Sequence, residues 1–286
     1  MKLPFQINLN GKTAVVTGAG GVLCSSFAEA LAECGANVAV LDLRLEAAEA
    51  VASKIRANGG KANAYACNVL DKASLEEARE KINAELGECS ILINGAGGNN
   101  PKGTTTKEYL FPEDLDEEAA KDITTFFDLD PKGIEFVFNL NFLGTLLPTQ
   151  VFAKDMAKQA DPVILNVSSM NAFRPLTKIP AYSGAKAAVS NLTAWLAVHF
   201  AKIGIRCNAI APGFFVTNQN RALLMNEDGS LTPRSEKILN ATPMGRFGEP
   251  EELLGTLLWL CDAKASGFVN GIVVPIDGGF SAYSGV

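Results

Sequence analysis

Histidine is almost absent from this chain of 286 residues, in which His199 is the only one. A metal site or a Ser-His-Asp triad usually needs a second histidine or a nearby nucleophile beside such a residue. His199 stands in AWLAVHFAKIG, a pattern typical of the end of a long helix. We therefore expect a structural or surface histidine and no metal site. Any proton transfer in this protein must be assigned to another residue type.

Paired cysteines, long apolar runs and clustered positive charge are also missing. None of the six cysteines belongs to a CxxC pair, and most stand in apolar surroundings typical of reduced core residues. The formal net charge of -6 disfavours a nucleic-acid surface, which needs clustered Lys and Arg. No segment approaches the roughly 20 apolar residues of a membrane helix, and MKLPFQINLNGK is no secretory signal. We expect a soluble, cytoplasmic protein without nucleic-acid or membrane partners.

Short apolar segments alternate with helical patterns along the whole chain. The expected strands are TAVVTG, ANVAVLD, KANAYACNV, SILINGAG, PVILNVSS, IRCNAIAPG and GIVVPIDGG. The expected helices are residues 25–34, 45–58, 74–86, 136–156, 181–202 and 250–261. Such alternation indicates βαβ units and a parallel sheet covered on both faces. The sequence therefore predicts an α/β fold, a doubly wound parallel sheet of Rossmann type, in a single domain spanning residues 1–286.

Two long segments interrupt this alternation, each after an expected strand. Residues 98–135 are rich in Thr, polar and acidic residues, and residues 214–249 carry Asn, Arg, Pro and Gly. Loops of this length in a compact domain are typically binding loops or lids. We therefore interpret 98–135 as an insertion that covers the substrate and 214–249 as a substrate lid. A peripheral decoration is the alternative for the first segment.

A glycine-rich turn, Gly18-Ala-Gly20-Gly21, follows the first expected strand and precedes a helix. Glycines let the backbone approach a pyrophosphate, and a helix N-terminus attracts its charge. Asp42 ends the second strand, 24 residues after Gly18, where a carboxylate can accept hydrogen bonds from the adenosine ribose and would repel a 2′-phosphate. This pattern favours NAD over NADP, although Arg44 leaves NADP open. A plain tight turn and a solvated carboxylate are the alternatives.

Tyr182 and Lys186 stand four residues apart in a helical pattern, so both side chains project from one face of the helix. A tyrosine with a pKa of about 10 is a poor base at neutral pH, but a nearby ammonium lowers that pKa. Ser169, 13 residues upstream, ends the strand VILNVSS, where its hydroxyl can polarise a carbonyl. Asn141 begins NFLG in the preceding helix. Together these residues predict an acid/base site for hydride transfer between a nicotinamide dinucleotide and a carbonyl or alcohol.

The chain resembles the short-chain dehydrogenase/reductase family over nearly its whole length. The motifs that carry the resemblance are TGAGG, NGAG at 94–97, NFLG at 141–144, SS at 168–169, YSGAK at 182–186, RCNAIAPG at 206–213 and DGG at 277–279. It implies a tetrad in which Tyr182 donates or accepts the proton, Ser169 orients the substrate and Lys186 binds the nicotinamide ribose. Asn141 would hold a water in the proton relay. A homotetramer is also implied.

The glycine-rich turn, Asp42 and the same resemblance together predict the cofactor contacts. The residues expected to meet the cofactor are Gly18, Gly20, Gly21, Val22, Asp42, Asn68, Val69, Asn94, Ala96, Gly97, Tyr182, Lys186, Pro212, Gly213 and Thr217. In the family pattern, Asn68 and Val69 would meet the adenine and Thr217 the carboxamide. Two departures are visible: Val22 and Cys24 stand where later loop glycines are usual, and Asn68 replaces the usual Asp. A preceding glycine of the turn would then approach the pyrophosphate.

The long insertion, the segment SSMNAFRPLTKIPAY and the tail GGFSAYSGV resemble the sugar-acid branch of this family, in particular the D-mannonate oxidoreductases (fructuronate reductases). Arg174 and Lys178 lie on the loop between Ser169 and Tyr182, and an Arg fork suits a carboxylate. With Asn171 they form the expected substrate contacts, although an exposed loop arginine is the alternative. Further hydrogen bonds to hydroxyls are expected from Asn99, Asn100, Asn171 and Asn218.

The sequence leaves other functions open. Within the same family, a gluconate 5-dehydrogenase and a 3-oxoacyl carrier-protein reductase are the enzyme alternatives to interconversion of D-mannonate and D-fructuronate. A non-catalytic dinucleotide-sensing protein is the alternative from another class. An intact set of Ser169, Tyr182 and Lys186 argues against a sensor, because redox sensing does not require those residues together.

Overall fold

Seven parallel strands form the central sheet of the computed structural model, which describes residues 6–116, 118, 121–217 and 221–285. The strands are β1 (Thr13–Thr17), β2 (Asn37–Asp42), β3 (Lys61–Ala66), β4 (Ile91–Asn94), β5 (Val163–Val167), β6 (Arg206–Pro212) and β7 (Val273–Ile276). They lie in the order β3-β2-β1-β4-β5-β6-β7. The chain changes direction across the sheet between β1 and β4, the kind of switch point at which doubly wound sheets bind ligands. This arrangement confirms the expected Rossmann-type fold.

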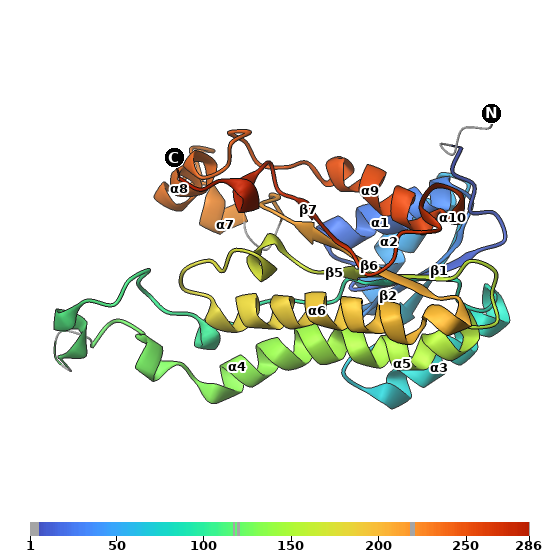
Figure 1. Ribbon diagram of the computed structural model, residues 1–286, viewed down its shortest axis with the longest axis horizontal. Helices are drawn as coiled ribbons and strands as arrows, with labels where there is room; N and C mark the ends of the chain where they lie inside the picture. The colour runs from blue at the N-terminus through green and yellow to red at the C-terminus, as the bar shows by residue number, and fades with distance from the viewer. Residues whose placement is uncertain (1–5, 117, 119–120, 218–220, 286) are drawn as a thin grey trace.

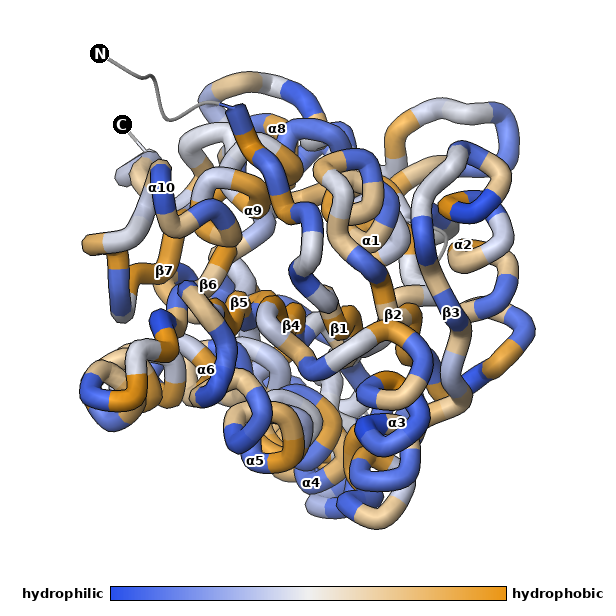
Figure 2. The backbone as a smooth tube through the Cα atoms, turned by 90° about the vertical axis from the view of Figure 1, so that its right-hand side faces the viewer, coloured by the Kyte–Doolittle hydropathy of each residue, from blue (hydrophilic) through white to orange (hydrophobic). Residues whose placement is uncertain are grey.

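Helices cover both faces of this sheet (Figures 1 and 2). α1, α2 and α9 lie on one face, and α3, α5 and α6 lie on the other. The helices are α1 (Val22–Glu33), α2 (Leu45–Ala57), α3 (Lys72–Glu85), α4 (Pro131–Phe138), α5 (Gly144–Met156), α6 (Pro180–His199), α7 (Arg221–Leu224), α8 (Pro233–Asn240), α9 (Leu254–Cys261) and α10 (Ala263–Ser266). The sequence pattern therefore predicted the layers correctly.

The two cores follow from the alternation of side chains along each strand. Val16 and Ile93 belong to the core beneath α1 and α9, whereas their neighbours Val15 and Leu92 belong to the core beneath α3 and α5. All four side chains are at most 1% exposed. Because successive strand residues point to opposite faces, a strand covered on both sides must be apolar at every position. The continuous apolar runs in the sequence have this origin.

The long helix before β5 begins at Pro131, five residues earlier than expected. Asp130 accepts a hydrogen bond from Lys132 N, and proline is favoured in a first helical turn. α4 joins α5 through a π-helical turn, Asn139–Leu143. The insertion expected over residues 98–135 therefore ends at residue 130, and its last part is helix.

By length and composition alone, the continuous helix Pro131–Met156 could cross a membrane, contrary to the expectation that no segment approaches this length and apolarity. Half of its most apolar window (50%) is buried inside the protein. Phe152 and Met156 are fully buried, and α5 packs against α3 and β4. The apolar character of this helix is thus used within the core of the fold.

The described residues between 99 and 130, namely 99–116, 118 and 121–130, form an arm that extends away from the body of the protein beside the start of α4 (Figure 1). The arm consists of loops and short 3-10 turns. Its base is attached to the loop before α6, because Thr105 N donates to Lys178 O at 2.9 Å. Its Glu108 forms an ion pair at 3.0 Å with Lys237 of α8, which belongs to the segment expected to act as a lid. The two interrupting segments therefore touch each other.

Candidate active site

The carboxyl ends of β4 and β5 and the first turns of α6 bring the predicted catalytic residues together. Ser169 follows β5, Tyr182 and Lys186 lie one turn apart on α6, and Asn141 lies in the π-helical turn before α5. A Cβ atom built on Gly97, which follows β4, would lie 2.7 Å from Asn141 Oδ1 and 3.1 Å from Lys186 Nζ. Residues far apart in sequence therefore converge on one backbone segment, where a side chain on residue 97 would displace the Asn141 and Lys186 side chains.

Lys186 is only 4% exposed, which is unusual for lysine. Its Nζ atom donates to Val167 O at 2.8 Å. Burial disfavours the charged form and lowers the pKa of Lys186 to about 8, while the nearby thiol of Cys24 acts in the opposite direction. An amine with this pKa remains mainly protonated at neutral pH and releases its proton in the range where acid/base catalysis operates.

Tyr182 lies beside this ammonium, with Lys186 Nζ 5.7 Å from the centre of its ring. Burial raises the pKa of Tyr182, and a hydrogen bond with Ser169 partly offsets that increase. The lowered pKa that we expected for this tyrosine is therefore not found, because loss of hydration outweighs the hydrogen bond with Ser169. In the structure the phenol is the stable form, which suits proton donation.

The Asn141 side chain fixes the loop after β4 to the helical layer. Its Nδ2 atom donates to Gly98 O at 2.7 Å and to Val137 O at 2.8 Å, and its Oδ1 atom accepts from Gly98 N at 3.3 Å. The residue is fully buried. Asn141 thus contacts the correct neighbours for the tetrad, but its amide is occupied by backbone groups. The expected role in holding a water remains a prediction.

The first turn of α1 fits a pyrophosphate. Gly21 is the N-cap residue and provides no side-chain cap, so the first backbone N–H groups of this helix remain open to a ligand. Val22 is the first helical residue, where a side chain does not obstruct the backbone N–H groups. Gly18 has a φ of 65°, and a Cβ on it would lie 2.8 Å from Ala96 Cα. Glycine is therefore required at this crossing of β1 and the loop after β4.

The Asp42 carboxylate at the end of β2 is held in a fixed orientation beside this turn. Its Oδ2 atom accepts from Gly20 N and its Oδ1 atom accepts from Arg44 N, each at 3.0 Å. A Cβ on Gly20 would lie 2.8 Å from Asp42 Oδ2. A 2′-phosphate would need free hydrogen-bond donors at this place. The two backbone N–H groups there already donate to Asp42, whose negative charge would also repel a phosphate.

Asn94, one of the expected cofactor contacts, has its side chain buried within the protein. It is 1% exposed, and its Nδ2 atom donates to Thr149 Oγ1 and Asn166 Oδ1 at 3.0 and 2.9 Å. The side chain thus joins a buried polar layer beneath the sheet edge. The residue that organises the loop after β4 is Thr17, whose hydroxyl accepts from the N–H groups of Gly95 and Ala96. We did not predict it, although it is the first letter of the TGAGG motif.

Asn68 and Val69 lie after β3, at the same edge of the sheet as Asp42. Asn68 is exposed, and its Oδ1 atom accepts from Leu70 N at 3.0 Å, which fixes a local turn. Val69 is 7% exposed and packs next to Gly144, where an added Cβ atom would lie 3.2 Å from Val69 Cγ2. This placement is compatible with an adenine contact.

Pro212 and Gly213 end β6 on the other side of the switch point. Gly213 N donates to Ile276 O at 2.9 Å, and a Cβ on this glycine would lie 2.6 Å from Asp277 Cα. Thr217 follows in the same loop and is half-buried. The loop between β6 and α7 is therefore packed directly onto the end of β7.

The three expected substrate residues lie on the loop between β5 and α6. Asn171 is 5% exposed, and its Oδ1 atom is buried without a hydrogen-bond partner among the described residues. Arg174 is exposed, and its Nε atom donates to Ser281 O at 3.0 Å. Lys178 has a φ of 72° and binds the arm through its carbonyl. The Asn171 Oδ1 atom, two residues after Ser169, is suited to accept a hydrogen bond from a ligand hydroxyl.

The other asparagines are used differently. Asn99 donates to Thr104 Oγ1 at 3.2 Å, and Asn100 Oδ1 accepts from Lys102 N at 2.9 Å, so both stabilise a turn of the arm. Asn218 lies outside the described residues. The structure thus brings Asn171 to the catalytic residues and places Asn99 and Asn100 within the arm.

Three features meet at one edge of this doubly wound sheet: an open helix N-terminus, a carboxylate at the end of a strand, and the set of Ser169, Tyr182 and Lys186. Together they define a nicotinamide-dependent oxidoreductase. The model of the family described as short chain dehydrogenase matches residues 12–228. The chain belongs to this family, and it is an oxidoreductase that acts on alcohol groups with a nicotinamide cofactor.

Two relatives match over nearly the full length. An uncharacterized oxidoreductase of Haemophilus influenzae is 62% identical over 286 residues, covering 100% of this chain and 99% of the relative. The uncharacterized oxidoreductase UxuB of Bacillus subtilis is 54% identical, covering 99% of this chain and 100% of the relative. A solved Haemophilus influenzae structure with bound NAD, described as a candidate D-mannonate oxidoreductase, is 62% identical, covers 100% of both chains and has a TM-score of 0.93.

Proposed function

We propose that this protein interconverts a sugar-acid alcohol and the corresponding ketone with NAD, and that the pair is D-mannonate and D-fructuronate. The observation that carries the chemistry is the buried arrangement of Tyr182, Lys186 and Ser169 at the carboxyl edge of the sheet. The similarity to the NAD-bound candidate D-mannonate oxidoreductase supports the choice of substrate.

When bound, the nicotinamide accepts a hydride from the alcohol carbon or returns it to the ketone carbon. Tyr182 exchanges the proton of the substrate hydroxyl, and its buried phenol is a donor in the direction of reduction. Ser169 holds the substrate oxygen next to that phenol and polarises the carbonyl. The ammonium of Lys186 stabilises the phenolate form of Tyr182, which is left after proton donation in reduction and is needed to accept the proton in oxidation, and we propose that it also binds the nicotinamide ribose.

We propose NAD as the cofactor because Asp42 already occupies the donors around the ribose. Two backbone N–H groups point at its carboxylate, and its charge would oppose a 2′-phosphate. Gly18, Gly20, Gly21 and Val22 would cradle the pyrophosphate, and Pro212, Gly213 and Thr217 would lie along the nicotinamide.

The substrate assignment is supported by polar groups on the loop before α6. The unpartnered Oδ1 atom of Asn171 is suited to a sugar hydroxyl, and the guanidinium of Arg174 is suited to the carboxylate. Lys178 contributes positive charge on the same loop. An acyl chain would leave these polar groups without partners, which opposes its binding.

A homotetramer in the cytoplasm completes the proposal. Leu253, Leu257 and Leu260 are fully buried within the chain, so this leucine segment belongs to the core. Exposed apolar residues are also present on α4 and α6, where Phe136 is 45% exposed and Trp195 is 56% exposed. Such side chains on adjacent helices are suited to contacts between subunits. Sedimentation at several protein concentrations tests this assembly.

The proposal is tested by a screen of hexonates, hexuronates and 3-oxoacyl thioesters with NAD and NADP in both directions. We expect turnover of D-mannonate with NAD and of D-fructuronate with NADH, and weaker turnover with the phosphorylated cofactors. Turnover of gluconate alone would assign the protein to the gluconate 5-dehydrogenases. Turnover confined to the thioesters would contradict a sugar-acid substrate.

A further inference from the structure

The chain after β7 forms a tightly ordered turn, residues 277–283, which we call the C-terminal turn. Asp277 Oδ1 accepts from Gly279 N at 3.0 Å, and Asp277 Oδ2 accepts from Ser281 N at 2.9 Å. Gly278 and Gly279 have φ angles of 64° and 89°, which other residues rarely adopt. The DGG motif therefore encodes one specific backbone shape, in which one carboxylate binds the N–H groups of Gly279 and Ser281.

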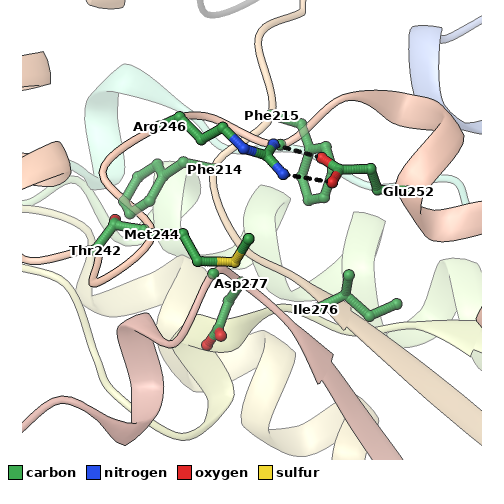
Figure 3. A pocket seen from close by; sticks show the side chains of 10 residues that line it. Phe214, Phe215, Thr242, Met244, Arg246, Glu252, Ile276 and Asp277 are labelled. Carbon is green, nitrogen blue, oxygen red and sulfur yellow. Dashed lines mark hydrogen bonds and ion pairs between the residues drawn. The ribbon is translucent and has the colours of Figure 1, made fainter.

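This turn contacts the segments that border the active site. Gly278 O accepts from Met244 N of the lid at 3.1 Å. The Phe280 ring packs edge-on against Phe214, with ring centres 5.3 Å apart and an interplanar angle of 72°. Figure 3 shows Asp277 beneath Met244, with its carboxylate directed away from the ion pair of Arg246. The C-terminal turn therefore joins the end of β7 to the lid and to the loop after β6.

A third contact reaches the catalytic loop. The carbonyl of Ser281 accepts a hydrogen bond from Arg174 Nε at 3.0 Å. Within the described part of the chain, Nη1 and Nη2 of Arg174 have no hydrogen-bond or ion-pair partner. Arg174 lies five residues after Ser169 on the same loop. One end of the guanidinium is thus anchored, and the two terminal nitrogens remain available.

We propose that the C-terminal turn is a positioning element that orients Arg174 for the carboxylate of the substrate, with Asp277 as its organising residue. This inference rests on the proposed function, because it assumes an acidic substrate. An arginine anchored through Nε loses less side-chain entropy when its terminal fork binds a carboxylate in a bidentate manner. Lysine has no equivalent of Nε, so charge alone cannot replace this arrangement.

Asp277 acts on binding of the acid through the backbone of Ser281 and through Arg174, and it touches neither substrate nor cofactor in this account. Loss of its two hydrogen bonds should therefore weaken substrate binding without altering the chemical step. A merely structural residue would instead change stability, cofactor binding or kcat. A rise in KM at an unchanged kcat indicates the positioning role, whereas a fall in kcat indicates a merely structural role.

The experiment compares Arg174→Lys and Asp277→Asn with the wild-type protein, using D-mannonate and NAD. Asp277→Asn keeps the shape of the side chain but replaces one acceptor oxygen with an NH2 group. We expect the KM for D-mannonate to rise roughly 10-fold or more in Arg174→Lys and about 3-fold to 10-fold in Asp277→Asn, with kcat within about twofold. The Kd of NADH, measured by fluorescence, should stay within about twofold in both variants.

Asp71→Asn is the matched control, because Asp71 also caps a backbone N–H group, that of Ala73 at 2.9 Å, at the start of α3. It should leave the KM for D-mannonate unchanged. Oxidation of D-mannonate with an unchanged KM in either test variant would overturn this inference alone. A wild-type protein that does not oxidise D-mannonate would overturn the proposed function and this inference together. If Asp277→Asn does not fold, Arg174→Lys alone decides the outcome.

Discussion

Lys186 should reduce the stability of the protein at neutral pH because its charge is buried for catalysis. Replacement by methionine preserves the length and much of the volume of the side chain but removes the charge. The folded protein lowers the pKa of Lys186 from 10.5 to about 8, so below pH 8 the folded state carries the full cost of a desolvated ammonium. That cost disappears as the pH rises through 10.5, where the amine is neutral in both states.

The size of this effect follows from the pKa difference. Each pKa unit corresponds to about 1.4 kcal/mol, so the wild type should gain about 2–3 kcal/mol of unfolding free energy relative to Lys186→Met between pH 7 and pH 10. The hydrogen bond from Nζ to Val167 O is also lost in the variant. That loss shifts the difference between the two proteins by a similar amount at each pH, so it does not hide the trend.

Urea unfolding followed by tryptophan fluorescence, at one protein concentration, measures the difference at each pH. The comparison should be repeated in a Tyr182→Phe background, because the neighbouring phenol also titrates at high pH. An unfolding free-energy difference that stays constant within about 0.5 kcal/mol from pH 7 to pH 10 would refute this reasoning. It would mean that the lysine is hydrated in the folded protein.

Three other substitutions test separate parts of the account. Asp42→Ala should raise the kcat/KM with NADP relative to NAD by about 10-fold or more, because it removes the charge that repels a 2′-phosphate; equal preference before and after the change would contradict this. Gly95→Ala should lower thermal stability, since its Cβ would lie 2.2 Å from Cys24 Sγ, and adding Cys24→Ala should restore part of the loss. If the ion pair between Glu108 and Lys237 helps to close the arm onto the lid, Glu108→Gln should make kcat/KM less sensitive to salt. Lys237→Met should have the same effect. A salt dependence of kcat/KM that is unchanged in both variants would exclude such a role.

Much of the fold could be predicted from the sequence because its signals are local. The alternation of apolar strands with helices specifies a covered parallel sheet, and the four-residue spacing of Tyr182 and Lys186 places both on one face of α6. The position of Ser169 after a strand then follows from the rule that ligands bind at the carboxyl edge. Each of these inferences needs only neighbouring residues.

The features that could not be predicted depend on contacts between distant segments. The buried side chain of Asn94, at the end of β4, bonds to Asn166, which lies 72 residues later. The raised pKa of Tyr182 depends on how completely the folded chain removes water from the phenol. The bond from Arg174 to Ser281 joins residues 107 apart. No local pattern encodes such pairs, although DGG signalled that the second segment has a special backbone shape.

The start of α4 is a different kind of error, because the sequence did contain its signal. Asp130 followed by Pro131 is a typical helix start, with a capping carboxylate and a proline in the first turn. Apolar periodicity becomes clear only after Phe136, so the periodic pattern alone predicts a helix start five residues too late. The cap at Asp130 places the end of the insertion at residue 130.

The central claim is that the hydroxyl of Tyr182 exchanges the substrate proton at a site that still binds NAD when this hydroxyl is removed. The most direct measurement compares the wild type with Tyr182→Phe for NADH affinity and for turnover of D-mannonate with NAD. We predict an NADH Kd within about twofold and a kcat lower by about 100-fold to 10,000-fold, as expected for loss of a general acid/base. Turnover within about threefold of the wild type would contradict the account. NADH binding without turnover of any substrate in either protein would point instead to a dinucleotide sensor.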